Sequence, residues 1–113
     1  MNGYFIFLVS TIRLFKYPTE ILQNYMTEIT ISDFQSLIRK MYFEKDFERG
    51  AEATFLWLME EVGELAAAIR SGTDAELRGE FADVIAWLTT IANVKGIDLT
   101  EAVKEKYGSG CPG

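Results

Sequence analysis

Apolar side chains recur at helical spacing over two long stretches of the chain. The first stretch, residues 51–69, carries Phe55, Leu58, Val62, Leu65 and Ile69. The second stretch follows a short break and carries Phe81, Val84, Ile85, Leu88, Ile91 and Ala92. Spacings of three and four residues place each set along one side of an α-helix. We therefore predict two long amphipathic helices, each with one apolar stripe.

Capping residues define the first of the remaining helices. Ser32 and Gln35 have the spacing of a capping box, and they predict a helix that opens there and runs to about Phe43. Gly50 marks the next break, before the helix over residues 51–69.

The break at Gly72 is the most informative turn. Thr73 and Glu76 form a second capping box directly after it and open a helix that stops at Gly96. Only two or three residues separate this helix from the one before it, so the two must be antiparallel neighbours. Asp98, Glu101 and Gly108 mark the start and end of a short fourth helix.

These elements predict an all-α fold with one compact domain over residues 30–113. Residues 1–29 form an apolar extension, read as an accessory strand or helix, and Met26 is a possible alternative start. The apolar run over residues 4–9 is too short to span a bilayer and lacks signal-peptide features. Because one hairpin buries too little apolar surface, we expect dimerisation into a four-helix-bundle core.

Composition and charge narrow the function. The net charge of −6 argues against a nucleic-acid polymer or an anionic membrane as partner. Cys111 is the sole cysteine, so a reducing cytoplasmic setting is expected. The chain has no histidine, which removes Ser-His-Asp and Cys-His catalysis, Glu-x-x-His di-iron sites and most zinc sites. Carboxylate chemistry with a hard cation is what this composition allows.

Four acidic residues are placed symmetrically about the turn at Gly72. Glu64 and Glu80 each lie eight residues from it, and Glu61 and Asp83 each lie eleven. In an antiparallel pair with axes about 8–10 Å apart, these side chains converge on one small volume. The helical wheel places them beside the apolar stripes, bordering the core but not buried in it.

Solvated helix faces are the alternative explanation for such acidic residues. However, Glu60 and Glu64 repel each other at i, i+4 spacing, and no lysine or arginine lies at a relieving offset on that face. A divalent cation site accounts better for the cluster. Mg²⁺ fits the oxygen ligands best, and Mn²⁺ is an acceptable substitute. Such an ion bridges phosphoryl oxygens and activates water, which favours hydrolysis of a nucleoside triphosphate.

The stretch Phe55–Leu65, followed by Glu80–Trp87, resembles the E-E-x-x-E and E-x-x-D pattern of MazG-type nucleotide pyrophosphohydrolases. The likeness covers about residues 32–110. It implies an all-α, Mg²⁺-dependent enzyme, dimeric or tetrameric, that cleaves a nucleoside triphosphate into the monophosphate and pyrophosphate. By position, the residues that match the metal ligands are Glu61, Glu64, Glu80 and Asp83. Glu60 matches a residue that holds a further metal or orients the attacking water.

Other residues are weaker candidates for substrate contacts. Trp57 and Trp87 each lie fifteen residues from Gly72, where they either stack on a nucleobase near the metal or fill the core. Candidates to neutralise phosphate charge, or else ordinary surface charges, are Lys45, Arg49, Lys104 and Lys106.

The leading hypothesis is a house-cleaning activity on non-standard or surplus deoxynucleotides. The alternatives are a phosphoribosyl-ATP pyrophosphohydrolase, which shares the helical chemistry, and a non-catalytic module whose acidic face binds a cation or a basic partner.

Overall fold

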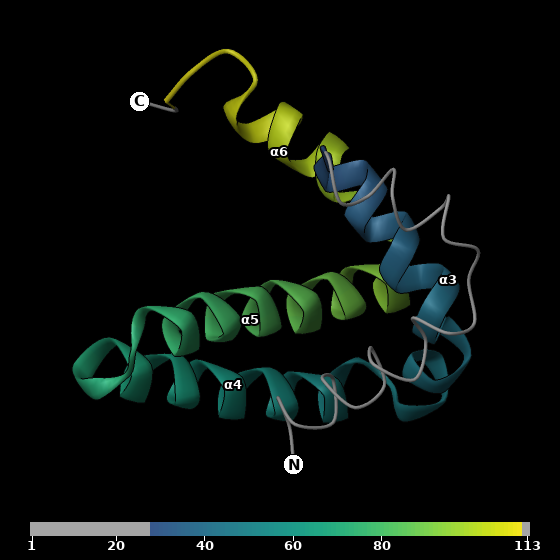
Figure 1. Cartoon of the computed structure of the whole chain (residues 1–113). Coiled ribbons are helices and arrows are strands. Elements are labelled where there is room, and N and C mark those ends of the chain that lie inside the picture. The colour runs from purple at the N-terminus through teal and green to yellow at the C-terminus, as the bar shows by residue number, and fades with distance from the viewer. Residues whose placement is uncertain (1–27, 112–113) are drawn as a thin grey trace.

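A computed structural model describes residues 28–111, which are helical with no strand in that range (Figure 1). The helices are α3 (Ile31–Arg49), α4 (Ala51–Ser71), α5 (Asp74–Lys95) and α6 (Leu99–Tyr107). The all-α prediction is confirmed for this part of the chain. The predicted extension over residues 1–29 and the alternative start at Met26 fall almost entirely outside the described residues. No helix within the described range is long and apolar enough to cross a membrane.

Helices α4 and α5 form the predicted antiparallel hairpin (Figure 1). Gly72 and Thr73 alone connect them. The Thr73 hydroxyl accepts a hydrogen bond from the Glu76 amide at 3.2 Å, and the Glu76 carboxylate accepts one from the Thr73 amide at 2.9 Å. This capping box satisfies two amides that have no partner inside the helix, so it fixes where α5 begins.

The predicted bounds of α3 were wrong at both ends. Its capping box is formed by Thr30 and Asp33, not by Ser32 and Gln35. The helix continues beyond Phe43 to Arg49, because no helix-breaking residue precedes Gly50. Gly50 has φ 85° and ψ 164°, a backbone conformation that is essentially restricted to glycine, and it lets α4 start directly after α3.

The Gln35 side chain connects three elements instead of capping its own helix. Its amide nitrogen donates to Asn93 Oδ1 at 3.1 Å and to the Ile97 carbonyl at 2.7 Å. Its carbonyl oxygen accepts from the Leu99 amide at 2.8 Å. Gln35 therefore ties α3 to the end of α5 and to the start of α6. The predicted Asp98 cap of α6 is confirmed, since its side chain accepts from the Glu101 amide.

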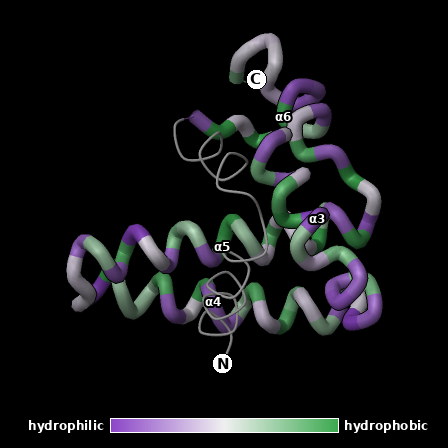
Figure 2. The backbone as a smooth tube through the Cα atoms, turned by 45° about the vertical axis from the view of Figure 1, so that its right-hand side comes forward, coloured by the Kyte–Doolittle hydropathy of each residue, from purple (hydrophilic) through white to green (hydrophobic). Residues whose placement is uncertain are grey.

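The hydrophobic core lies between α3 and α5, where Ile38 and Tyr42 pack with Ala86. Figure 2 shows hydrophobic and hydrophilic residues alternating along α4 and α5. The predicted apolar stripes of these two helices are largely exposed: Ile69 is 64% exposed and Phe81 is 50% exposed. Of the eleven stripe residues, only Leu58 and Ala92 are buried.

The buried face of α4 is therefore not the predicted stripe. Thr54, Leu58 and Glu61 are its buried residues, a stripe shifted by one position from Phe55 and Val62. The tight turn decides which faces of a hairpin meet, and here it turns α4's acidic and threonine side toward α5. Most of the apolar stripe therefore faces away from the partner helix of the hairpin and is exposed.

Candidate metal and nucleotide site

Three carboxylates from the two arms of the hairpin lie close together. Glu61 and Glu64 of α4 and Glu80 of α5 each place one oxygen within 4.8 Å of the others. Glu61 and Glu64 share a helix face because they are three residues apart. The two-residue connection at Gly72 brings Glu80 level with them from the facing helix. We refer to these three residues as the carboxylate cluster.

Glu61 is the most unusual member of the carboxylate cluster. Its exposed fraction is 0%, and neither carboxyl oxygen has a hydrogen-bond partner within residues 28–111. The sequence predicted a position bordering the core, so this complete burial is a correction. Burial raises the pKa of Glu61 to about 8, with the negative charges of Glu64, Asp83 and Glu80 adding to the shift.

Two further groups have raised pKa values. Burial, followed by the charge of Glu64, raises the pKa of Glu80. Burial, followed by the charges of Glu80 and Glu64, raises the pKa of Asp83 to about 6. Asp83 is outside the group of three whose oxygens meet within 4.8 Å, yet it lies close enough to affect Glu61. None of these acids pairs with a lysine or arginine of the described chain.

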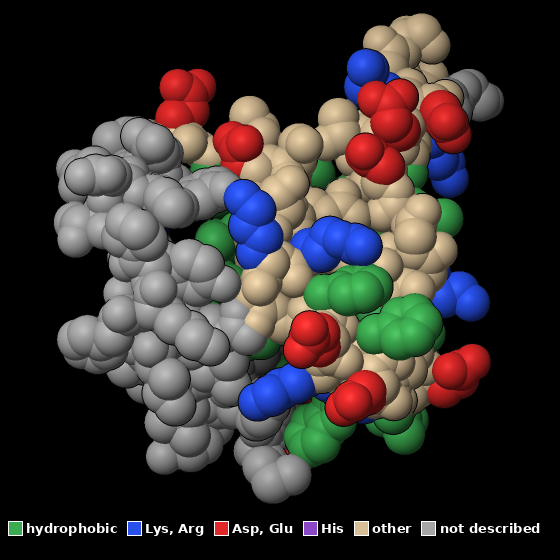
Figure 3. Space-filling model, turned by 90° about the vertical axis from the view of Figure 1, so that its right-hand side faces the viewer, with side chains coloured by type: hydrophobic (Ala, Val, Ile, Leu, Met, Phe, Trp, Pro, Cys, Tyr) green, Lys and Arg blue, Asp and Glu red, His purple; other side chains and the backbone are tan. Residues whose placement is uncertain are grey.

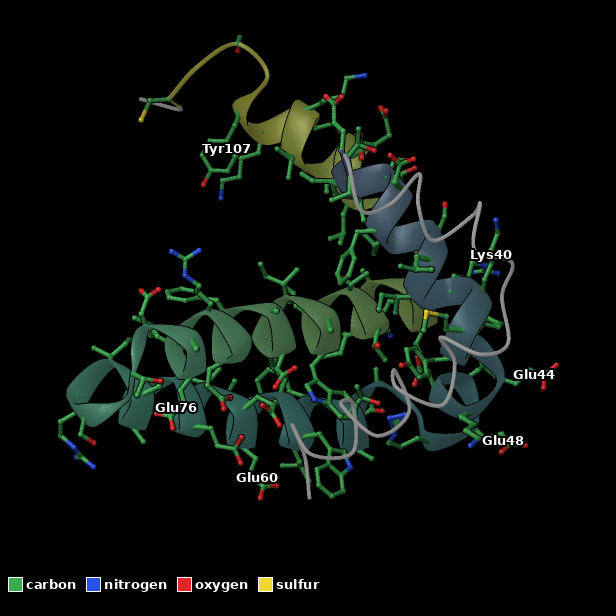
Figure 4. The ribbon with its side chains drawn as sticks, viewed as in Figure 1. Lys40, Glu44, Glu48, Glu60, Glu76 and Tyr107 are labelled. Atoms are coloured by element: carbon green, nitrogen blue, oxygen red, sulfur yellow. The ribbon has the colours of Figure 1, made fainter. Side chains whose placement is uncertain are left out.

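Glu60 lies apart from the carboxylate cluster. It is exposed, and in Figure 4 its side chain points away from α5, on the opposite side of α4. Adjacent helix residues are about 100° apart, so Glu60 and Glu61 cannot both face α5 fully. The catalytic role predicted for Glu60 remains a prediction.

The two tryptophans stack on each other beside the cluster. The ring centroids of Trp57 and Trp87 are 6.2 Å apart, with their planes inclined by 13°. Trp87 is 3% exposed, whereas Trp57 is half-buried. Of the two, Trp57 therefore has more ring surface that a ligand can reach. Base stacking by either residue remains a prediction.

Besides Trp57, the Trp87 ring also contacts Arg49. The centre of its guanidinium is 5.1 Å from the Trp87 ring centroid, and Nη2 forms an ion pair with Asp46 Oδ1 at 2.6 Å. Asp46 is buried and was missed by the sequence analysis. Its i, i+3 spacing from Arg49 was the available signal, but such pairs are common on exposed helix surfaces.

The three lysines predicted as phosphate contacts are exposed. Lys104 pairs with Glu101 at 3.4 Å, and the Lys106 ammonium lies 5.7 Å from the Tyr107 ring centroid. Both belong to α6, which projects away from the hairpin in Figure 1. In the view of Figure 3, basic side chains are scattered among acidic and hydrophobic ones and form no continuous patch. Within residues 28–111, none of the three lysines forms an ion pair with the carboxylate cluster.

The residues present suit a divalent cation. Carboxylate oxygens are the preferred ligands of hard cations. Among residues 28–111, the oxygens of Glu61 lack the donors that a buried carboxylate otherwise requires. A cation at the cluster would offset the mutual repulsion that adds to the effect of burial in raising the three pKa values. The fold and site thus define a helical protein with a carboxylate cluster fit for a divalent metal.

The comparison with protein families names that class. The profile described as "MazG nucleotide pyrophosphohydrolase domain" matches residues 49–112, which include α4, α5 and α6. The chain belongs to the MazG nucleotide pyrophosphohydrolase family, as its motifs predicted. A search of curated proteins found no significant match.

Proposed function

We propose that this protein is a Mg²⁺-dependent nucleoside triphosphate pyrophosphohydrolase that converts a (d)NTP to the (d)NMP and pyrophosphate. One observation carries the proposal. Glu61 is completely buried, and neither of its carboxyl oxygens has a hydrogen-bond partner in the described part of the chain. It lies within reach of carboxylates from both arms of the hairpin. Burying an acid beside other acids lowers the stability of the folded protein. Such arrangements are found mainly at functional sites.

In this proposal, the carboxylate cluster and Asp83 hold Mg²⁺, and Mn²⁺ substitutes for it. When bound, the ion neutralises phosphoryl oxygens and lowers the pKa of water. We assign the catalytic role to Glu61, because its burial among other acids raises its pKa and the arrival of positive charge would favour release of its proton. Glu60, from its exposed position, is assigned the orientation of water or of a further metal, and this role needs an independent test.

The remaining contacts are assigned by location. Trp57 offers a partly exposed ring next to the buried Trp87 and is the candidate for stacking on the base. Lys45, Lys104 and Lys106 are assigned to the charge of the phosphate tail, in an assembly of more than one chain. The biological role we propose is removal of non-standard or surplus deoxynucleotides from the cytoplasm.

The test is pyrophosphate release from a panel of dNTPs and phosphoribosyl-ATP, with Mg²⁺ or with EDTA. We expect Mg²⁺-dependent release of pyrophosphate from dNTPs, with a loss of at least about 100-fold in Glu61→Gln and Asp83→Asn. The matched control is Glu44→Gln, since Glu44 is exposed and points away from the hairpin in Figure 4. Faster turnover of phosphoribosyl-ATP would move the protein to that pathway.

A comparison of Glu60→Gln with Glu61→Gln separates the two neighbouring acids. Loss in both supports the role proposed for Glu60, and loss in Glu61→Gln alone assigns catalysis to the cluster. Activity that survives EDTA, or both substitutions, rejects the mechanism. The protein would be a non-catalytic module if it showed no activity with or without Mg²⁺, bound Mg²⁺, and bound no nucleotide.

We further propose that the active form is a homodimer or homotetramer. The exposed apolar residues of the hairpin are Phe55, Leu56, Met59, Val62 and Ile69 on α4, and Phe81, Ile85 and Leu88 on α5. An apolar surface of this extent is typical of an interaction site. Packing two hairpins through these residues would create a four-helix core.

A further inference from the structure

Arg49 is held in place on two sides and has an unused donor. Its Nη2 is fixed by Asp46, and its guanidinium lies over the Trp87 ring. Its side chain is only 18% exposed, and the buried Nη1 has no hydrogen-bond acceptor among residues 28–111. A buried charged donor without an acceptor is unfavourable, so it indicates that an acceptor arrives with a ligand or with water.

The position of Arg49 shows which part of a nucleotide it would meet. Starting from Gly72, the hairpin presents the pair Glu64 and Glu80 first, and Glu61 with Asp83 next. Trp57 and Trp87 follow about 6 Å further along, since each lies four residues beyond its nearest acid. Arg49 contacts this last layer, on Trp87.

This order separates Arg49 from the phosphate end of the site. If the phosphates of a nucleotide lie at the carboxylate cluster and its base extends along the hairpin away from Gly72, the base meets the tryptophans and then Arg49. The charge of Arg49 is already balanced by Asp46 at 2.6 Å, which makes it a weak partner for a triphosphate. What it retains is one directional N–H donor beside an aromatic surface, the arrangement that reads the edge of a base.

We propose that Arg49 recognises the base and not the phosphates: its Nη1 donates a hydrogen bond to a carbonyl oxygen on the nucleobase. The inference rests on the proposed function and adds a substrate class to it. Bases with a carbonyl at the contacted edge, such as hypoxanthine and guanine, are preferred over adenine, which presents an amino group there. Asp46 is a positioning residue, because it orients the guanidinium without contacting the substrate.

The experiment compares kcat/KM for dITP and dATP, two substrates that differ at the purine 6-position. We expect the wild-type protein to prefer dITP by about 5- to 100-fold. Arg49→Met keeps the length and the packing against Trp87 but has no donor. It should bring the ratio to about one, chiefly by slowing dITP. The matched control Arg78→Met removes an exposed arginine that pairs with Asp74 on α5, and it should leave the ratio unchanged.

A phosphate role for Arg49 predicts another result: both substrates slow equally in Arg49→Met and their ratio persists, which overturns the proposal. A wild-type ratio near one also overturns it. For Asp46→Asn we expect an intermediate ratio, and a wild-type ratio would remove the positioning role of Asp46. If Arg49→Met does not fold, Arg49→Lys takes its place in the comparison of dITP with dATP, because lysine retains the charge but not the planar fork.

Failure of the proposed function is distinguishable from failure of this inference. If the wild-type protein releases no pyrophosphate from any nucleotide, the function fails, and equilibrium binding of dITP and dATP with Ca²⁺ then decides the base preference. Tighter binding of dITP that is lost in Arg49→Met supports the inference. Equal binding, or no binding of either nucleotide, rejects it.

Discussion

Replacing Glu61 with glutamine should stabilise the metal-free protein at alkaline pH while it abolishes activity. Glutamine has nearly the same shape as glutamate but carries no charge. In the folded protein Glu61 has a pKa of about 8, against an ordinary value of 4.5. Between these two values the folded state keeps a proton that the unfolded state releases. The stability of the wild-type protein therefore falls as pH rises through this window.

The magnitude follows from the size of the shift. Each pKa unit corresponds to about 1.4 kcal/mol, which sets an upper limit of about 5 kcal/mol on the stability lost by pH 9. Glutamine avoids this loss and can donate to the neighbouring carboxylates. At pH 5 the wild-type Glu61 is protonated in the folded state, so the two proteins should differ by less than about 1 kcal/mol.

The assay is urea unfolding in EDTA at pH 5 and pH 9, with Glu44→Gln as the control. At pH 9 we expect Glu61→Gln to be more stable than wild type by about 2–5 kcal/mol. Addition of Mg²⁺ at 100 times its dissociation constant should then stabilise the wild type by about 2.7 kcal/mol and leave Glu61→Gln unchanged. If Glu61→Gln is less stable than wild type at pH 9, burial of a charged Glu61 is not the cost inferred above. If Mg²⁺ stabilises both proteins equally, Glu61 does not bind the ion.

Three further predictions address the fold and assembly. Leu56→Glu, at a position 71% exposed in one chain, should convert an oligomer to monomers in light scattering, and an unchanged mass would exclude this face as the interface. Gln35→Ala removes the hydrogen bonds that join α3 to α5 and α6, and should lower the free energy of unfolding by about 1–3 kcal/mol; a neutral result would contradict the bridge. Gly50→Ala should lower it by about 1–3 kcal/mol because of φ 85°, whereas Gly63→Ala, in open space on α4, should be neutral or stabilising.

The helix ends of the hairpin could be predicted because their determinants are local. Thr73 and Glu76 are three residues apart in sequence and bond to each other's amides, so the pattern suffices to place the start of α5. The same reasoning failed at Ser32 and Gln35, since two overlapping boxes compete there. Gln35 has partners some sixty residues away, at Asn93 and Leu99, which no local pattern reveals.

The sequence was enough to predict which acids come together at the candidate site, but not how deeply they are buried. Equal distances from Gly72 were enough to bring Glu61, Glu64 and Glu80 together. Burial was not predictable, because it depends on which face the turn directs inward. An apolar stripe favours burial of that helix face, but it does not identify the surface that would cover it. Asp46 was missed because its burial, too, depends on which face of α3 packs against the other helices.

In the proposed site, acids from both arms of the hairpin bind one divalent cation that engages a nucleotide. A crystal structure of the protein with Mg²⁺ and a non-hydrolysable dNTP tests it most directly. We predict a cation about 2.1 Å from carboxylate oxygens of both α4 and α5, including Glu61, and in contact with the phosphates. A nucleotide bound elsewhere, or a cation that contacts neither Glu61 nor α5, would rule out this metal site.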